Sequence, residues 1–405
     1  MTDICAPTKQ AINLGNMPKK LRFEVFDSMS NTPSAWDLAA PTDNIFLQRT
    51  YLTSLEETPP QGMQFCYTVV YDGLQVLGVV YGQLKLFRAS DSLQPIEHEK
   101  QGCFFDVIGQ YLKGALANLV EFETLICGNL LLTGEHGYYF NTTLVSKNEI
   151  DEIVIGAAKA KAAFWEKQGR KASVTLIKDF YAQQKLPQNG FTEFSIQPSM
   201  VMDLPDTWDS FEDYMLALSS KYRVRTRRAF KKGAALHRKQ LTAQEVKSLA
   251  PKMYEYYLSV AENAGFNVVD MHQNYLPQLK ANLPEQVHIC GYFLEEVLVG
   301  YTTLIQNGNE LEAHFLGYDK KVNHDCQLYH NMLLDMLRFG IEHRHKNIVF
   351  ARTALEIKSS IGAQANEMYC YFKHRNHVSN KLLKHTLDIL EQKEPFTPRH
   401  PFKEE

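Results

Sequence analysis

Positive charge is concentrated in the segment KYRVRTRRAFKKGAALHRK, residues 221–239, which contains nine Lys and Arg residues and no acidic one. If this segment is helical, most of its cations fall on two adjacent sides. They are Lys221, Arg225, Arg228 and Lys232 on one side, and Arg223, Arg227 and Lys231 on the other. Such a cluster repels itself unless anions neutralise it, and the arginine fork can bind phosphate through two hydrogen bonds. The pattern indicates either a site for a phosphate-bearing ligand or a solvated helix face.

A second candidate site lies in the segment ELEAHF, which contains Glu312 and His314. On a strand, side chains two residues apart share a face, so these two point one way while Ala313 points the other way. A Glu with a raised pKa, or a neutral His, can accept a proton from an amine that would otherwise be unable to attack. The alternative is a pair of polar side chains on a solvated strand face.

Overall composition limits the kind of protein that carries these residues. The chain has 405 residues, of which 44% are hydrophobic and 22% charged, and this length fits a globular protein of two domains. The 43 Lys and Arg against 46 Asp and Glu give a formal charge of −3, so only a local patch could attract a polyanion. No stretch has the roughly 18 apolar residues of a membrane helix, and the first 20 residues lack a signal peptide's apolar core. We expect a cytoplasmic protein without an integral membrane segment.

Cysteine and histidine spacing predicts neither disulfides nor a metal site. The seven cysteines are scattered and form no C-x-x-C pair or Cys/His cluster. His343 and His345 are two residues apart, a spacing that does not place both rings on one helix face.

The first half of the chain predicts an ordered series of elements after an irregular lead-in over residues 1–40. A helix near residues 45–57 is followed by a hairpin over 65–87, because Asp72-Gly73 separates two β-rich runs. A strand in ETLICGNLLLTG, a helix that ends near Gly169 and strands in ASVTLI and GFTEFSIQPSMVMDL complete the series.

The second half predicts the same order. A long helical region, at about 209–282, precedes a hairpin in VHICGYFLEEVLVGYTTLIQ that turns at Glu295-Glu296. A strand in ELEAHFLGYD, a helix in QLYHNMLLDMLRFGIEH and strands in NIVFART and IGAQANEMYCYFKHR follow. We therefore predict an α/β chain with a first domain over 41–204 and a second over 205–405, each a mostly antiparallel mixed sheet flanked by helices.

This order of elements resembles the GNAT acyltransferase fold in tandem. Three stretches also resemble the Fem-type aminoacyl transferases and the related peptidoglycan biosynthesis/recognition proteins. SFEDYMLALSSKYRVRTRRAFKKG is similar to the basic helix that opens their second domain, and QLYHNMLLDMLRFGIEH to the core helix of that domain. IKSSIGA resembles their F-K-x-x-F-G segment, with Lys358 and Gly362 retained and Ile357 and Ile361 in place of the two aromatic residues.

The resemblance implies roles for residues near this segment. Lys358 would lie beside the carbonyl of the donor and stabilise the oxygen that gains charge, although it could equally cap a helix or pair with Glu356. Arg352 would open into the same cleft and hold a carboxylate or phosphate. GNAT enzymes that use acyl-CoA carry a Gly-rich turn for pyrophosphate after the central strand. The corresponding link in this chain, LGYDKKVNHDCQLY, has Gly317 as its one glycine, with Lys320 and Lys321 in place of the others. These two lysines would then have to hold phosphates by charge.

The function that we expect is N-acyl transfer from an activated donor, acyl-CoA or aminoacyl-tRNA, to a primary amine, with a cell-envelope precursor as one candidate acceptor. No bound cofactor is expected, and the partner is a phosphate-bearing small molecule or precursor, or a tRNA. The candidate catalytic residues are Lys358, Glu312 and His314. The candidate phosphate-binding residues are Lys221, Arg223, Arg225, Arg228, Lys232, Arg352, Lys320 and Lys321. The second half would carry the chemistry and the first would form scaffold and substrate wall. The alternative is a non-catalytic GNAT-like binding protein that recognises an envelope precursor or RNA.

Overall fold

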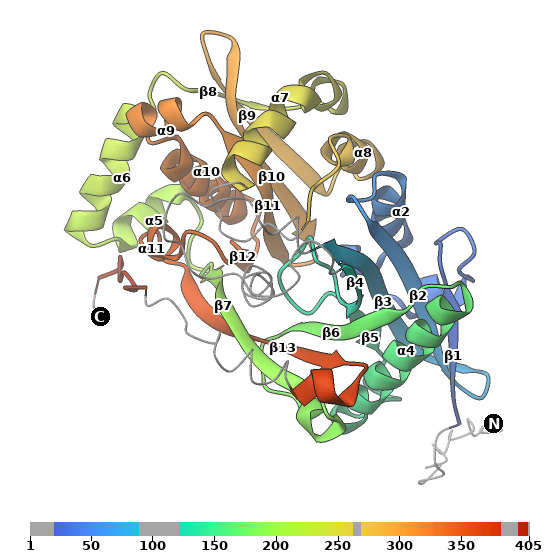
Figure 1. Cartoon of the computed structure of the whole chain (residues 1–405). Helices are drawn as coiled ribbons and strands as arrows, with labels where there is room; N and C mark the ends of the chain where they lie inside the picture. The colour runs from blue at the N-terminus through green and yellow to red at the C-terminus, as the bar shows by residue number, and fades with distance from the viewer. Residues whose placement is uncertain (1–19, 89–120, 262–268, 382–395, 404–405) are drawn as a thin grey trace, which may run out of the picture.

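In the part of the chain that the structure describes, one mixed sheet of 13 strands takes strands from both halves, and helices cover both of its faces (Figure 1). The computed structural model describes residues 20–88, 121–261, 269–381 and 396–403. Within these ranges no helix combines the length and the apolar character needed to cross a membrane. The predicted α/β fold class is confirmed.

In the first half, strands come both before and after a long helix along the chain. Its strands are β1 (Leu21–Phe26), β2 (Met63–Asp72), β3 (Gln75–Arg88), β4 (Glu121–Cys127), β5 (Tyr138–Phe140), β6 (Ala172–Phe180) and β7 (Thr192–Asp203). Its helices are α1 (Ala35–Ala39), α2 (Arg49–Glu57) and α4 (Lys147–Lys167), with short 3₁₀ turns η1 (Ile45–Leu47) and η2 (Leu186–Asn189).

The second half is richer in helices. Its strands are β8 (His237–Gln240), β9 (Val287–Leu294), β10 (Val297–Asn307), β11 (Glu310–Tyr318), β12 (Asn347–Val349) and β13 (Gln364–His374). Its helices are α5 (Phe211–Ala217), α6 (Ser220–Lys232), α7 (Ala243–Ala261), α8 (Tyr275–Asn282), α9 (Lys320–Cys326), α10 (Leu328–Glu342) and α11 (Leu355–Ser359).

Both predicted hairpins are confirmed, and two expectations are wrong. β2 pairs with β3 around Gly73, whose φ of +60° suits a glycine, and β9 pairs with β10 around Glu295-Glu296. The lead-in is not irregular over its whole length, because β1 pairs with β2 along the edge of the sheet and α1 follows. The region 209–282 is interrupted by β8, which pairs with β9. β1 has the sequence LRFEVF, whose alternation of apolar and charged residues could have indicated a strand, whereas β8 has only the four polar residues HRKQ and offers no such signal.

The two halves exchange their last strands. The sheet order is β1-β2-β3-β4-β6-β13-β7-β12-β11-β10-β9-β8, so β13 pairs with β6 of the first half and β7 pairs with β12 of the second. On either side of the β13–β7 pair the pattern is the same, with an antiparallel neighbour and then a parallel step, β6 to β4 and β12 to β11. The sheets of the two halves are therefore joined into one, because β7 lies between β13 and β12 of the second half.

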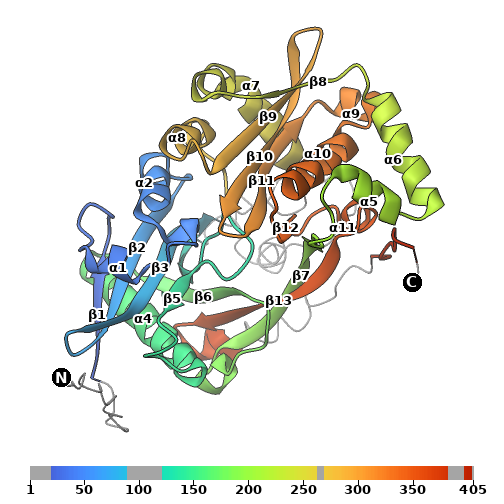
Figure 2. The ribbon, with the colours of Figure 1, turned by 180° about the vertical axis from the view of Figure 1, so that it is seen from behind.

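Alternation along the strands builds a core on each face of the sheet. In β2, Phe65, Tyr67 and Val69 join a cluster that includes residues of α2, α7 and α8, and therefore of both halves. Val70 points to the other face, where residues of α4 pack. In the second half, α7 and α10 lie on opposite faces of the strands, as the two views show (Figures 1 and 2).

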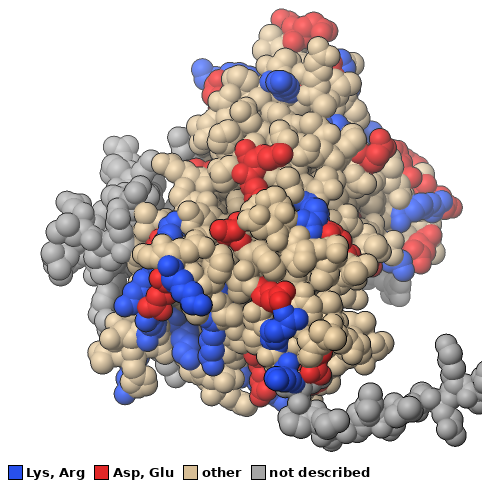
Figure 3. Space-filling model, turned by 90° about the vertical axis from the view of Figure 1, so that its right-hand side faces the viewer, with Lys and Arg blue, Asp and Glu red and all other residues tan. Residues whose placement is uncertain are grey.

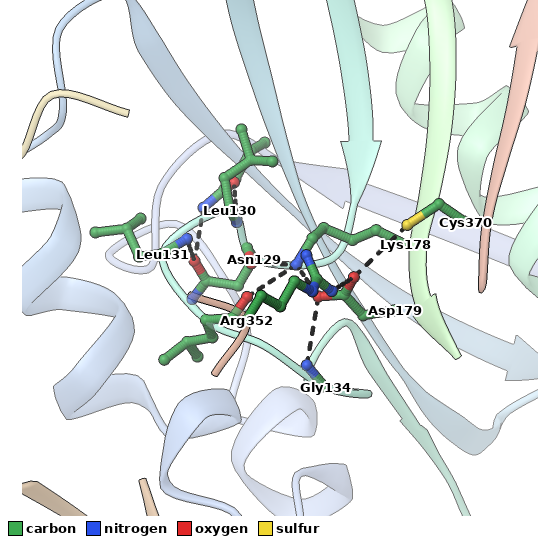
Figure 4. A network of polar contacts seen from close by, with 10 residues as sticks. Asn129, Leu130, Leu131, Gly134, Lys178, Asp179, Arg352 and Cys370 are labelled. Atoms are coloured by element: carbon green, nitrogen blue, oxygen red, sulfur yellow. Dashed lines mark hydrogen bonds and ion pairs between the residues drawn. The ribbon is translucent and has the colours of Figure 1, made fainter. Parts of the chain in front are cut away.

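A buried charge cluster joins segments from both halves at the centre of the sheet (Figure 4). Asp179, at the end of β6, is fully buried and forms ion pairs with Lys178 and Arg352. The Lys178 ammonium also donates to the carbonyls of Asn129 and Leu132, at 2.8 and 2.9 Å. Burial alone would raise the pKa of Asp179, but the two cations hold that pKa below its usual range. The cluster therefore fixes the loop over 129–134 against the end of β12.

We expect the Arg352→Met variant to lose about 3 kcal/mol of unfolding free energy, because Asp179 would keep only one of its two cations in a dry site. Urea unfolding of the whole chain measures this loss. The matched control is Arg375→Met, which removes an ion pair to Glu166 with both side chains about half exposed (49% and 50%) and should cost under about 1 kcal/mol. Equal losses for the two variants would contradict a structural role for the cluster.

Candidate active site

The three predicted catalytic residues line one cavity. This cavity has a volume of about 390 Å³, and Glu312, His314 and Lys358 all contribute to its wall. The wall is built by β11, α7, α10 and the segment from Phe350 to Lys358 of the second half, together with Leu131 and Thr133 from the loop of the first half. The strand exchange and the charge cluster thus bring both halves to the same site.

Glu312 is a buried carboxyl group in the wall of this cavity, with 4% of the residue exposed. Desolvation raises the pKa of Glu312 well above its usual range, and the neighbouring Glu310 adds to the shift, whereas Lys178 and a backbone hydrogen bond from Thr133 oppose it. Burial therefore favours the neutral, protonated form of this carboxyl group, which can donate one hydrogen bond while its oxygens still accept others.

Lys358 is the second buried ionisable group of the cavity, also 4% exposed. It lies in α11, which begins directly after Ala354, a residue in the left-handed conformation. Its ammonium donates to the carbonyl of Phe350. Burial lowers the pKa of Lys358 to about 7, with Glu312 acting in the opposite direction. Near neutral pH this amine therefore exists in both protonation states, which suits a group that exchanges protons.

His314 is linked to the interior of the first half through tyrosines. Its Nε2 lies 2.9 Å from the hydroxyl of Tyr275, a fully buried residue of α8 that neighbours Tyr51. Burial lowers the pKa of His314 to about 3, so the ring is neutral and a weak base. Asn129 in turn donates to the Tyr51 hydroxyl at 3.3 Å. Tyr275 was not predicted as a site residue, because nothing in the sequence connects α8 with β11.

Residues 396–403 do not line the cavity but support α11, a role that the sequence did not indicate. Phe402 packs beside Gly362, where φ is +114° and an added Cβ would lie 2.5 Å from the Phe402 ring. The backbone N–H of Arg399 donates to the Ser359 hydroxyl at 3.1 Å, and that of Ser219 donates to the Pro401 carbonyl at 2.8 Å. This segment therefore fastens α11, which carries Lys358, to the start of α6.

The basic segment forms α6 as far as Lys232, as predicted, and most of the charge of this helix faces solvent, whereas Arg238 and Lys239 lie in β8. Thr226 and Ala229 are its buried side, against α10, where Asn331 donates to the Ala229 carbonyl at 3.0 Å. Among the described residues, no acidic side chain pairs with its exposed cations, which are Lys221, Arg225, Arg227, Arg228, Lys231 and Lys232. Arg223 is half-buried and donates to the Leu218 carbonyl. On the side of the molecule away from α6, acidic groups are interspersed with basic ones, although Lys and Arg gather at the lower left of the view (Figure 3).

The other residues that were predicted to bind phosphate lie in two different environments, one exposed and one buried. Lys320 and Lys321 are exposed at the start of α9, which packs against α6, so they lie on the same side of the molecule as the cations of α6. The prediction that Arg352 opens into the cavity is corrected, because its guanidinium pairs with the buried Asp179 and the residue does not line the cavity. Sequence reasoning placed Arg352 correctly at the strand end but could not identify its partner 173 residues away.

α10 lies between the basic surface and the cavity. Tyr329, Leu333 and Met336 line the cavity, whereas His330, on another side of the same helix, is close enough to Arg225 for that charge to add to the lowering of its pKa by burial. A ligand that spans from α6 to the cavity would thus have to pass around or along one helix.

No protein-family profile matches the sequence, and no curated protein is similar to it. Among solved structures, a FemX structure is 13% identical, with 82% of this chain and 97% of that chain covered at a TM-score of 0.49. A tandem GNAT protein from the clavulanic acid biosynthesis pathway is 11% identical, covering 88% and 99% at a TM-score of 0.48. L-PGS from Bacillus licheniformis is 10% identical, covering 84% and 96% at a TM-score of 0.43. Both kinds of protein that the sequence resembles are thus among the solved structures similar to this chain.

Proposed function

We propose that this protein is an N-acyltransferase that moves an acyl or aminoacyl group from an activated donor to a primary amine in the cavity of the second half. The observation that carries the proposal is that two buried groups line one cavity, Lys358, with a pKa lowered to about 7, and Glu312, with a raised pKa. Two groups whose pKa values are shifted toward neutrality from opposite sides are suited to acid–base work.

The proposed step assigns each group the role that its protonation state allows. The amine lone pair attacks the carbonyl carbon, the C–N bond forms and the carbonyl electrons move to the oxygen. Neutral Lys358, oriented by the Phe350 carbonyl, accepts the proton that the attacking nitrogen loses. The protonated Glu312 carboxyl donates a hydrogen bond to the oxygen that gains charge. When the intermediate collapses, the bond to the leaving group breaks and Lys358 returns its proton to that group.

These roles reverse the ones expected from the sequence, in which Lys358 stabilised the oxygen and Glu312 or His314 was the base. The reason is burial, because the cavity disfavours both charged forms. His314 is left with a positioning role in this proposal, since its neutral ring is held by Tyr275.

Lys358→Ala should lower turnover by roughly 10²–10³ with little change in substrate affinity, as expected when a proton acceptor is removed from the transition state. The assay offers the purified protein pools of acyl-CoA and aminoacyl-tRNA with primary amines and detects new amides by mass spectrometry. The wild-type rate should rise with pH through about 7, because protonated Lys358 cannot act as a base below that value. Lys358→Arg should not restore activity, since a guanidinium stays protonated.

The matched control is Lys346→Ala, which removes an exposed lysine just before β12 and should keep wild-type turnover. A rate that falls above pH 7 would instead assign the cationic form of Lys358 to the oxygen, as the sequence suggested. If no donor yields product while a phosphate-bearing ligand binds, the protein is a non-catalytic GNAT-like binding protein, the alternative that the sequence leaves open.

The exposed face of α6 is the proposed binding surface for the phosphates of the donor or acceptor. Reversing charge with Arg225→Glu and Arg228→Glu should weaken binding of a tRNA probe at least tenfold at low salt and flatten its salt dependence, because fewer counterions are released. Lys159→Glu and Lys167→Glu on α4 change the net charge equally at exposed positions and are the control. If both double variants bind like the wild type in filter-binding titrations, α6 is a solvated face.

A further inference from the structure

The cavity wall beyond Glu312, His314 and Lys358 is mainly apolar. Leu131, Leu333 and Met336 are aliphatic parts of that wall, and Phe315 and Phe350 are aromatic parts. Each of these five side chains is buried or partly buried and belongs to, or packs against, one of the hydrophobic cores. The cavity is therefore an extension of the core into which a ligand can reach.

Three tyrosines contribute to the wall, and for Tyr257 this contribution is ring surface rather than a free hydroxyl group. The Tyr257 hydroxyl donates to the Val269 carbonyl at 2.9 Å, so its hydrogen-bonding capacity is used inside the protein. Its ring packs edge-on against Phe315, with centroids 5.3 Å apart. Tyr318 and Tyr329 lie with their ring centroids 5.7 Å apart.

The polar groups are few and lie together. Glu312 interacts electrostatically with Lys358 and is hydrogen-bonded by the Thr133 backbone. Thr353 and Ala354 are exposed, so the cavity reaches solvent beside the start of α11. A reacting carbonyl next to Glu312 and Lys358 can thus be reached from outside, while the apolar wall receives whatever is attached to it.

Resting on the proposed function, we propose that the transferred acyl group carries an apolar chain, aliphatic or aromatic, and that this chain occupies the cavity. A charged side chain placed against Leu131, Leu333 and Phe350 would lose its hydration, and these apolar side chains offer it no hydrogen bond in return. An apolar cavity of about 150 Å³ is enough for benzene, so about 390 Å³ accepts a considerably larger group.

Isothermal titration calorimetry with straight-chain fatty acids of increasing length tests the proposal without requiring turnover. Affinity should rise about fourfold with each added methylene. The rise should stop at the length that fills the cavity. Straight-chain alkylamines of the same lengths form the second arm, and they should show a weaker dependence on length. An affinity for the acids that is independent of length, or a steeper dependence for the amines, would overturn the proposal, the latter by assigning the cavity to the acceptor.

Substitutions of residues that line the cavity test where the apolar chain of the acyl group binds. Ala261 and Ala39 are partly buried helical alanines that pack against the same core, but only Ala261 lines the cavity. Ala261→Phe should shorten the longest acid that still gains affinity and weaken its binding at least tenfold, whereas Ala39→Phe should stay within about twofold of the wild type. Leu316→Ala enlarges the cavity at a half-buried position and should extend the favoured length. An unchanged length profile in both Ala261→Phe and Leu316→Ala would overturn the proposal.

Failure of this inference and failure of the proposed function give different results. If the acids do not bind but amide formation still depends on Lys358, the chemistry stands and the apolar acyl group is wrong. If the acids bind with the expected length dependence but no amide forms, the cavity is an apolar binding site in a protein that is not a transferase.

Discussion

The centre of this structure depends on the compensation of one buried negative charge, that of the Asp179 carboxylate. Its two cations come from β6 and from the end of β12, and the Cys370 thiol of β13 lies 3.6 Å from the same carboxylate. The charge is compensated only when these segments are all in place. The loop that supplies Thr133 and the segment that leads into α11 are therefore held relative to each other, although they come from different halves of the chain.

The two buried carboxyl groups, Asp179 and Glu312, respond to burial in different ways. At Asp179, the neighbouring cations hold the carboxyl pKa below its usual range, although burial lowers the pKa of one of them, Lys178. In the cavity, Glu312 and Lys358 have few compensating contacts, and the same exclusion of water shifts both toward their neutral forms. This contrast, rather than burial alone, separates a structural cluster from one that can exchange protons at neutral pH.

Local signals in the sequence predicted most elements but few of the partnerships between them. Asp72-Gly73 indicated a hairpin, and the period of two in β11 placed Glu312 and His314 together, because both rest on neighbouring residues. Lys358 was predicted as a site residue only because IKSSIGA resembles a known segment. Other contacts join residues far apart in the chain, and the periodicity of neighbouring residues carries no information about them. They are the pairing of β7 with its strand partners, the ion pair of Arg352 with Asp179 and the contact of Phe402 with Gly362.

The position of β13 has a consequence for synthesis. β6 and β7 are consecutive strands of the chain, yet β13 lies between them in the sheet. Because the N-terminal part of a chain is made first, both strands leave the ribosome well before the strand that separates them exists. Until then each presents an unpaired edge of the kind that invites aggregation or premature pairing. The centre of the sheet can therefore be completed only in a late, non-local step, after β13 has been made.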